Sequence, residues 1–505
     1  MSEALNLAGY FESQSESGSE PASDPQSDFR SDRPALVVGD RVTSYRELSQ
    51  RVACWRGGLV AAGVRQGDRV AILAGNGEEF VLAHLAAIGV GAISVPLNPQ
   101  SPPAELAREL AVVDPFVAVT DAGAAKALAA ALAMTVNLEV PSVPLAELDD
   151  AQPHAIVDVA PGDTAVLLFT SGTAGMSKPA ILTHRNLVAG LEAVLSLPVD
   201  LVATPRVFIG VIPLFHVFGL NTILHLCLLT GGTLVLSDFE SPEATIELIA
   251  SHQVSVVAGP PTLWRWLCRA PGATPEQFSS VALAVSGAAK LDPQLKIEVD
   301  DRLGVDLTEG YGLTETSAVV AASIATEAPL GSVGRLLPGV EARIVDLAGS
   351  DCLVGDPGEL LVRGDMVFPG YWGVSSGNAS PIDADGWLHT GDIAVVDEAG
   401  FLAIVDRRKD LIIVSGFNVF PAEVESILMA HPAVSQAGVV GEPSESTGEA
   451  VVAFVVPVEG AAPDDAELRE HCQKELARYK IPSRIVIAAD LPIGPTGKLR
   501  RNRLG

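Results

Sequence analysis

Residues 170–178 combine hydroxyl side chains, glycines and a lysine in one short stretch. An apolar run at residues 165–169 precedes them, as expected for a buried strand that leads into a loop. Small residues let backbone N–H groups close around anionic oxygens, and the lysine adds positive charge. The segment therefore predicts a loop that holds the polyphosphate of a nucleotide.

The spacing separates this loop from two better-known nucleotide loops. A Walker loop needs four residues between its first glycine and a Gly-Lys-Ser/Thr ending, and neither residues 170–178 nor residues 494–498 have that spacing. No Gly-x-Gly-x-x-Gly motif follows an early strand. P-loop kinases and Rossmann dehydrogenases are thus disfavoured, and a plain Ser/Gly surface turn is the alternative.

The elements that would position the loop alternate between strands and helices. Strand-like apolar runs, with an amphipathic helical stretch at residues 79–89 among them, occur at residues 69–73, 92–96, 116–119, 207–212, 254–258 and 282–286. This alternation predicts a layered α/β architecture with largely parallel sheets. After Val340 the strands shorten, which predicts a small β-rich subdomain, and a small α+β unit follows it.

Length and composition limit the class of protein. A chain of 505 residues should form two or more domains, and a net charge of −29 disfavours nucleic acid and anionic membranes as partners. The five cysteines include no Cys-x-x-Cys pair, and no basic leader starts the chain, so we expect reduced thiols and a cytoplasmic location. Residues 207–237 carry no charge, but Pro213 and Gly231-Gly232 favour strand, buried helix and strand over a transmembrane helix.

The chain resembles the adenylate-forming superfamily, in its acyl-CoA synthetase branch. The resemblance covers residues 33–505, and it rests on motifs that occur in the family's order: residues 170–178, Pro213–Leu220, Ser286–Ala289, Glu309–Glu315, Thr390–Asp392, Asp406–Asp410 and Pro495–Lys498. The resemblance implies a large N-terminal domain of layered α/β subdomains with a small β-rich subdomain, followed by a mobile α+β lid. We expect a flexible acidic segment at residues 1–33, the adenylation domain at 34–406 and the lid at 407–505, with a hinge at 406–410.

The implied reaction has two steps. ATP and a carboxylate give acyl-AMP and pyrophosphate, and coenzyme A then displaces AMP to form a thioester. A carboxylate that attacks an α-phosphorus is one anion approaching another, so the first step needs positive charge and a metal ion, here Mg²⁺. One lid cannot serve both steps in a single position, so the family rotates it between them.

The resemblance assigns roles residue by residue. Lys498 would bridge carboxylate and phosphate oxygens, His216 would gate the acid pocket, and Glu315 would be the catalytic Mg²⁺ ligand. Lys409 would be the hinge residue. Besides Lys498, the residues expected to contact ATP or AMP are Thr170, Ser171, Gly172, Thr173, Ala174, Gly175, Lys178, Gly287, Ala288, Ala289, Glu309, Gly310, Tyr311, Gly312, Thr314, Asp392 and Arg407. Those expected to contact coenzyme A are Ser415, Gly416 and Phe417.

The acid and the acceptor are less constrained. Residues 215–219 contain no acidic partner for an amino group, which disfavours amino acids, and the aliphatic stretch 220–229 suits an apolar tail. A medium- or long-chain fatty acid is the first expectation and a cinnamate-like aryl acid the second. A carrier protein as acceptor, a non-catalytic AMP- or acyl-binding relative and a luciferase-like oxidation stay open, as do the monomer and the homodimer.

Three residues depart from the family's usual loop. Ala174 lacks a hydroxyl, Ser177 stands where proline is common, and Pro179 stands where glycine usually follows the lysine. Because proline fixes φ, we expect the backbone to be less rigid before Lys178 and more rigid after it than in the family's usual loop. We expect weak ATP affinity.

Overall fold

The structure is a computed structural model, and it describes residues 6–9, 11, 32–135, 138–170, 177–201, 206–346, 348–374, 380–414, 417–444, 447–492, 499 and 501–504. For Lys409 the description is confined to the backbone. The chain divides into two compact units. Unit 1 comprises residues 1–327, 336–341 and 363–388, and unit 2 comprises residues 328–335, 342–362 and 389–505.

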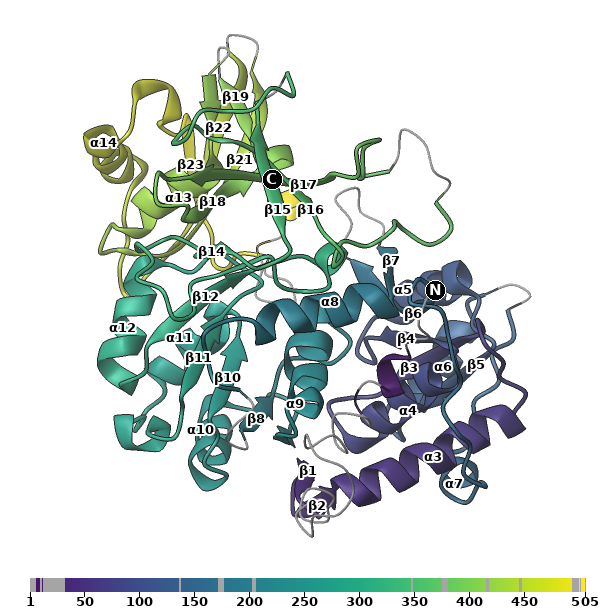
Figure 1. Ribbon diagram of the computed structural model, residues 1–505. Coiled ribbons are helices and arrows are strands. Elements are labelled where there is room, and N and C mark those ends of the chain that lie inside the picture. Colours follow the sequence, from purple (N-terminus) through teal and green to yellow (C-terminus); the bar gives the residue numbers. More distant parts are fainter. Residues whose placement is uncertain are drawn as a thin grey trace. The chain divides into compact units, whose positions relative to one another are not determined.

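The first sheet of unit 1 carries the predicted phosphate loop. Its strand order is β5-β3-β4-β6-β7, with bounds β3 (Arg69–Leu73), β4 (Ile93–Leu97), β5 (Val117–Thr120), β6 (Thr164–Thr170) and β7 (Lys178–Thr183). Strands β3 to β6 are parallel, as the alternating pattern predicts, while β7 pairs with β6 in the antiparallel direction. Three helices accompany these strands, namely α4 (Glu78–Gly89), α5 (Pro103–Val113) and α6 (Ala125–Leu132) (Figure 1).

The second sheet carries the other predicted nucleotide residues of unit 1. In the described residues its order is β14-β13-β12-β11-β10-β8-β9-β1-β2. The strands are β1 (Pro34–Val38), β2 (Arg41–Ser44), β8 (Val207–Gly210), β9 (Thr233–Leu236), β10 (Val256–Gly259), β11 (Leu283–Ser286), β12 (Leu307–Tyr311), β13 (Ala321–Ala322) and β14 (Arg335–Leu336). The remaining helical segments of unit 1 are α3 (Tyr45–Ala61), α7 (Leu145–Asp149), α8 (His184–Leu195), α9 (Leu226–Leu229), α10 (Pro242–Ser251), α11 (Pro261–Arg269), η2 (Pro275–Phe278), α12 (Pro293–Leu303) and η3 (Thr314–Thr316).

The uncharged stretch 207–237 folds as strand, helix and strand. Strand β8 leads to a π-helix, η1 (Phe218–His225), which continues into α9 and then β9. Within the described ranges, no helix is both long and apolar enough to cross a membrane. A π-helix of this length is rare and commonly marks a functional site.

The first described residues lie inside the segment expected to be flexible. Leu7, Ala8 and Phe11 are buried, and the Asn6 amide donates hydrogen bonds to the carbonyls of Ile88 (2.9 Å) and Val157 (2.8 Å). Apolar side chains and a satisfied amide hold these residues in the core. The expectation of flexibility therefore concerns the residues after Phe11, and residues 12–31 lie outside the described ranges.

Unit 2 contains two sheets. One has the order β15 (Glu341–Val345), β16 (Gly358–Arg363), β17 (Leu388–Val396) and β18 (Leu402–Arg407). The other has the order β20 (Phe417–Val419), β19 (Ile412–Val414), β22 (Gly448–Pro457) and β21 (Val434–Ser444), with β23 (Arg484–Ile487) parallel to β22. Its helical segments are η4 (Arg408–Asp410), α13 (Pro421–Met429), α14 (Asp465–Glu475), η5 (Arg478–Lys480) and η6 (Arg501–Arg503). The predicted α/β class, with a large N-terminal and a smaller α+β C-terminal part, is confirmed.

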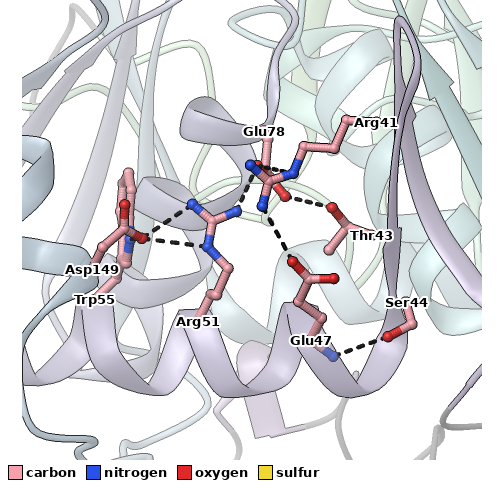
Figure 2. Close-up of polar contacts among 8 residues, drawn as sticks. All are labelled: Arg41, Thr43, Ser44, Glu47, Arg51, Trp55, Glu78 and Asp149. Atoms are coloured by element: carbon pink, nitrogen blue, oxygen red, sulfur yellow. Dashed lines mark hydrogen bonds and ion pairs between the residues drawn. The ribbon is translucent and has the colours of Figure 1, made fainter.

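A buried carboxylate joins the edge hairpin β1–β2 to the helices below it. Glu78, in the first turn of α4, is 6% exposed and accepts a hydrogen bond from Thr43 Oγ1 at 2.6 Å. Its Oε2 lies 2.5 Å from Arg51 Nη1 and 3.3 Å from Arg41 Nε (Figure 2).

Arg51 extends the same cluster to α7. Its Nη2 lies 3.1 Å from Asp149 Oδ1, and the Trp55 indole donates to the same oxygen at 2.7 Å. The cluster thus links β2, α3, α4 and α7, and each buried charge has a partner (Figure 2).

We expect Glu78→Gln to lower the free energy of unfolding of unit 1 by about 3 kcal/mol, because it leaves two arginines without their buried counter-charge. Urea unfolding followed by tryptophan fluorescence measures the change. Glu47→Gln is the matched control: it removes a partner of Arg41 that is 44% exposed and should cost less than about 0.5 kcal/mol. Equal effects of the two variants would contradict the importance of burial.

Candidate functional site

The β6–β7 hairpin fixes both ends of the predicted phosphate loop. Thr170 and Lys178 lie opposite each other in the register. Ser177 Oγ donates to the Thr170 carbonyl at 3.1 Å, and Thr170 Oγ1 donates to the Lys178 carbonyl at 3.3 Å. The tip itself lies outside the described residues, and so do five of the predicted contacts, Ser171, Gly172, Thr173, Ala174 and Gly175.

A distant segment pairs with the outer edge of β7. Ile181 N donates to the Gly370 carbonyl at 3.0 Å, and Trp372 N donates to the Pro179 carbonyl at 2.8 Å. Pro179 has no N–H to offer, but its carbonyl is used in this pairing. The pairing places Tyr371 beside the base of the loop.

Tyr371 lies between the loop lysine and the predicted metal ligand. Its hydroxyl donates to Glu315 Oε1 at 2.6 Å, and Lys178 Nζ lies 5.4 Å from the centre of its ring. Phe368 N also donates to the Glu315 carbonyl at 2.9 Å. Lys178 and Glu315 are thus brought to one place, through a tyrosine that the sequence analysis did not select.

The turn after Glu315 has unusual backbone. A Cβ on Gly312 would lie 1.3 Å from the Ala318 carbonyl oxygen, so only glycine fits there. Ser317 and Ala318 have φ of +55° and +109°, which side chains rarely adopt. Strain of this kind concentrates at functional sites.

The predicted adenine wall forms at neighbouring strand ends. Strands β11 and β12 are parallel, with Ser286 opposite Glu309, so their carboxyl ends share one edge. A Cβ on Gly287 would lie 3.2 Å from the Phe218 ring and 3.4 Å from the Gly310 carbonyl, which leaves little space for a side chain. The predicted set Gly287, Ala288, Ala289, Glu309, Gly310, Tyr311, Gly312 and Thr314 follows or ends these strands.

Two polar groups at this edge are buried. Burial raises the pKa of Glu309 to about 7, although Lys296 and Lys290 oppose the rise. Ser286 Oγ is buried and has no hydrogen-bond partner among the described residues. An orphaned hydroxyl beside a closely packed glycine fits a site for a polar ring such as adenine.

The predicted gating histidine is neutral. Burial lowers the pKa of His216 to about 4. Its ring packs against Phe215 with centroids 4.7 Å apart. At neutral pH the imidazole can exchange hydrogen bonds with a substrate, but it brings no charge to the site.

A cavity lies between α8, η1 and the residues after Glu315. Its free volume is about 10 Å³, room for about one water molecule. It is lined by Gly190, Leu191, Val194, Asn221, Thr222, Leu226, Ser317, Ala318 and Val319. This volume is far below the roughly 300–1,000 Å³ of a typical small-molecule pocket, so the cavity is not a ready-made site for an acid.

The residues fit a magnesium ion held largely by substrate. The described residues contain no cluster of three or more His, Cys, Asp and Glu side chains suited to a metal. Mg²⁺ is usually bound through one or two carboxylates plus substrate phosphates. Glu315, close to Lys178, meets this requirement.

Unit 2 brings together the two residues expected at the ribose. Asp392 and Arg407 are opposite each other on β17 and β18, and Arg407 Nε lies 2.7 Å from Asp392 Oδ1. Asp392 is only 2% exposed, and its backbone N donates to Thr390 Oγ1 at 3.0 Å.

The other residues with a predicted role in unit 2 are only partly described. Ser415, Gly416 and Lys498 lie outside the described residues, and the Lys409 backbone belongs to the short helix η4. Phe417 is 56% exposed and stacks on Tyr479 with centroids 4.7 Å apart.

The basic residues of the C-terminal unit are mostly ion-paired where they are described. Lys480 pairs with Glu423 at 2.6 Å, Arg501 pairs with Glu425 at 2.7 Å, and Arg484 pairs with Glu442. These carboxylates reduce the positive charge available for phosphate. The sequence could not reveal this pairing, because the partners are 42 to 76 residues apart.

Sequence reasoning missed Tyr371 and Glu109. The signal for Tyr371 was an aromatic residue in a Pro-Gly turn, which by itself is common. Glu109, on α5, is buried and hydrogen bonds to Ser177 at the base of the loop. Burial raises its pKa to about 7, and the charge of Glu105 adds to the rise.

Known proteins resemble this chain along most of its length. The family model described as "AMP-binding enzyme" matches residues 24–372, and "AMP-binding enzyme C-terminal domain" matches residues 423–498. A feruloyl-CoA synthase from Amycolatopsis sp is 35% identical over 470 residues, covering 92% of this chain and 94% of the relative. A long-chain-fatty-acid–CoA ligase from Yersinia pestis is 33% identical over 515 residues, covering 94% and 91%. The crystal structure of ATP-bound MatB from Rhodopseudomonas palustris superposes with a TM-score of 0.89 at 30% identity, covering 99% of this chain and 98% of MatB.

Tyr371→Phe should weaken the binding of Mg²⁺-ATP by about tenfold, since a hydrogen bond to a charged group is worth roughly 1.5–3 kcal/mol. Titration calorimetry measures the affinity. Tyr45→Phe is the control: it also loses a hydroxyl hydrogen bond, to the Gly232 carbonyl at 2.7 Å, but does not contact Glu315. Equal losses in both variants would count against a special role for Tyr371.

Glu109→Gln should change how stability depends on pH. Because the folded state raises the pKa of Glu109 from 4.5 to about 7, its contribution falls as pH rises through this window and is constant above it. The variant should match the wild type near pH 4 and exceed its stability at pH 8, by up to about 3 kcal/mol. Melting temperatures from pH 4 to 8 test this, with Glu147→Gln, at an exposed position on α7, as control. An unchanged profile would contradict the assignment.

Proposed function

We propose, since this chain belongs to the family of AMP-binding enzymes, that it is an AMP-forming acid–CoA ligase. It activates an apolar carboxylic acid with ATP, releasing pyrophosphate, and transfers the acyl group from acyl-AMP to coenzyme A. The observation that carries the proposal is the grouping of Lys178, Tyr371 and Glu315 at the base of the loop.

The grouping suits the charge problem of the first step. The carboxylate and the polyphosphate repel each other, and a lysine and a bound cation beside the phosphates offset this repulsion. When bound, Mg²⁺ would neutralise phosphate charge. Tyr371 holds the Glu315 carboxylate toward the loop through the hydrogen bond from its hydroxyl, so the carboxylate needs little reorientation when ATP binds.

The other residues keep the roles that the family resemblance gives them. Lys498 delivers positive charge to the reacting carboxylate and α-phosphate. Neutral His216 borders the acid without adding charge, and the paired Asp392 and Arg407 contact the ribose. The domain division at residues 406–410, the hinge at Lys409 and the coenzyme A contacts of residues 415–417 belong to the same proposal.

The acid is apolar. A medium- or long-chain fatty acid is the first candidate, since the buried residues of η1 and α9 are largely aliphatic. The fatty-acid–CoA ligase relative supports it.

A cinnamate-type acid is the second candidate. The feruloyl-CoA synthase relative supports this acid.

A panel of acids tests the proposal. Fatty acids of increasing chain length and cinnamates with and without ring hydroxyls are assayed for AMP release, each with coenzyme A and with a phosphopantetheinylated carrier protein. We expect AMP and thioester only with an apolar acid and coenzyme A. If none of the acids led to AMP release, the proposal would be wrong and a non-catalytic binding protein would be favoured. If the thioester formed only on the carrier protein, that protein and not coenzyme A would be the acceptor.

Lys498→Ala tests the role proposed for Lys498 in the first reaction step. It should abolish AMP release from ATP, by about a thousandfold or more as expected for a removed electrostatic catalyst. Thioester formation from supplied acyl-AMP should persist. Loss of both reactions to the same degree would contradict the role given to Lys498.

A further inference from the structure

A largely buried arginine holds the C-terminal segment of unit 2, whose described part is residues 499 and 501–504. Arg501 lies in the short helix η6, and its side chain is 18% exposed. Two of its nitrogens contact the Glu425 carboxylate of α13, with Nη2 at 2.7 Å from Oε2 and Nε at 3.2 Å from Oε1. Its Nη1 lies 3.3 Å from Oδ2 of Asp410, the last residue of η4. Arg501 therefore connects the C-terminal segment to α13 and to the proposed hinge.

Carboxylates face Arg501 from three elements of unit 2. Besides Glu425 on α13 and Asp410 on η4, Asp406 on β18 attracts the guanidinium. Asp406 and Glu425 are 7% and 8% exposed. Burial opposes the charge of Arg501, but the carboxylates outweigh burial and raise its pKa. Removal of the guanidinium would thus leave buried negative charge without compensation.

The partners of Arg501 are themselves fixed by backbone groups. Glu425 Oε1 accepts a hydrogen bond from the Val439 N–H of β21 at 2.8 Å. Asp406 Oδ2 accepts one from the Ala422 N–H, in the first turn of α13, at 2.8 Å. These contacts join β18, α13 and β21 independently of the C-terminal segment, so Arg501 binds to a surface that is already in place.

Apolar contacts hold the residues on both sides of Arg501. Leu499 and Leu504 pack on an apolar cluster of the sheet that contains β21 and β22, namely Val452, Phe454 and Leu491. A Cβ on Gly438 of β21 would lie 2.9 Å from a methyl carbon of each of these two leucines. The sheet thus leaves space for the leucines to approach its backbone, and the segment is held by apolar contacts as well as by ion pairs.

The held segment begins directly after Lys498, which itself lies outside the described residues. Consecutive Cα atoms are about 3.8 Å apart, so contacts that fix Leu499 and Arg501 limit where the backbone of Lys498 can lie. In the proposed function, Lys498 delivers positive charge to the reacting carboxylate and α-phosphate. Catalysis by a positioned group is sensitive to displacements of about 1 Å, so the anchoring of the segment bears on the first step.

We propose that Arg501 is a positioning residue for Lys498: by binding Glu425 and Asp410 it holds the C-terminal segment on α13 and the hinge, so that the lysine reaches the reactants of the first step. The inference rests on the proposed function, in which Lys498 serves that step. Since thioester formation from acyl-AMP is expected to persist without Lys498, it should persist without Arg501 as well.

Arg501→Met tests the proposal by separating the two half-reactions. The first is measured as acyl-AMP formation from ATP and an accepted acid, and the second as thioester formation from supplied acyl-AMP. We expect the first rate to fall by about a hundredfold, as for a catalytic group displaced by about 1 Å, and the second to stay within about twofold. Arg501→Lys keeps the charge but loses the contact through two nitrogens, and it should restore part of the first rate. Equal losses in both half-reactions, or no loss in the first, would overturn the proposal.

Glu425→Gln tests whether the contact with α13 is responsible. It removes the charge that Arg501 binds and should also slow the first half-reaction more than the second. In the double variant with Arg501→Met, the two effects on the first rate should not add, because both single variants remove the same contact. Additive effects would show that the two residues act separately and would contradict the proposal.

Arg469→Met is the matched control. Arg469, on α14 of the same unit, pairs with Asp465 at 2.8 Å and donates to the carbonyls of Pro482 and Ser483. These contacts involve neither the hinge nor the C-terminal segment. The variant should lower the melting temperature while leaving the ratio of the two half-reactions unchanged. If it shifts this ratio as Arg501→Met does, a loss of stability alone explains the effect and the proposal is wrong.

Limited proteolysis tests the position of the C-terminal segment without any turnover. Tryptic cleavage after Lys498 requires Leu499 and its neighbours to leave their contacts, so it reports local opening. Arg501→Met should speed this cleavage by about tenfold or more, and Arg469→Met should not, as followed by mass spectrometry. An unchanged cleavage rate in Arg501→Met would overturn the proposal. A wild type that forms acyl-AMP with none of the acids would refute the proposed function instead, and proteolysis would still decide whether Arg501 holds the segment.

Discussion

The candidate site depends on the pairing of β7 with both of its neighbours. On one side the β6–β7 hairpin sets Thr170 opposite Lys178, and on the other side residues 370–372 hydrogen bond to β7. This second pairing brings Tyr371, and with it Glu315, to Lys178 across well over a hundred residues of sequence. Backbone hydrogen bonds are insensitive to side-chain identity, so the arrangement tolerates the departures at Ser177 and Pro179.

Burial controls the charge state of the interior of unit 1. It raises the pKa of Glu109 and Glu309 to about 7, and it lowers the pKa of His84 and His216 to about 3 and 4. Each shift favours the neutral form, because desolvation penalises charge of either sign.

Backbone strain is concentrated at the same edge. Ala288, Ser317 and Ala318 have positive φ, and Gly312 leaves no space for a Cβ. These positions follow β11 and β12, the strands that carry the predicted adenine wall. The hydrogen bonds of Asn221 and of Ser317 Oγ, which donates to the Met366 carbonyl at 3.0 Å, hold the strained turn in place. Strain that is held by several independent contacts is a mark of a site under functional constraint.

The sequence by itself determined the layered α/β class, and it predicted a phosphate loop at residues 170–178 and nucleotide contacts at residues 286–289 and 309–315. These features depend on local patterns, such as an apolar strand that ends in small polar residues. The residues of each pattern are neighbours in the chain, so the pattern can be recognised from the sequence alone. Only the tertiary structure decided that Tyr371 joins Lys178 to Glu315, that Arg501 is neutralised by Glu425, and that His84 meets His225. Leu7 and Phe11 in the buried start of the chain belong to the same group. In each case the partners are distant in sequence and have ordinary local surroundings, so their contact follows from how sheets and helices pack and leaves no signal in the sequence pattern.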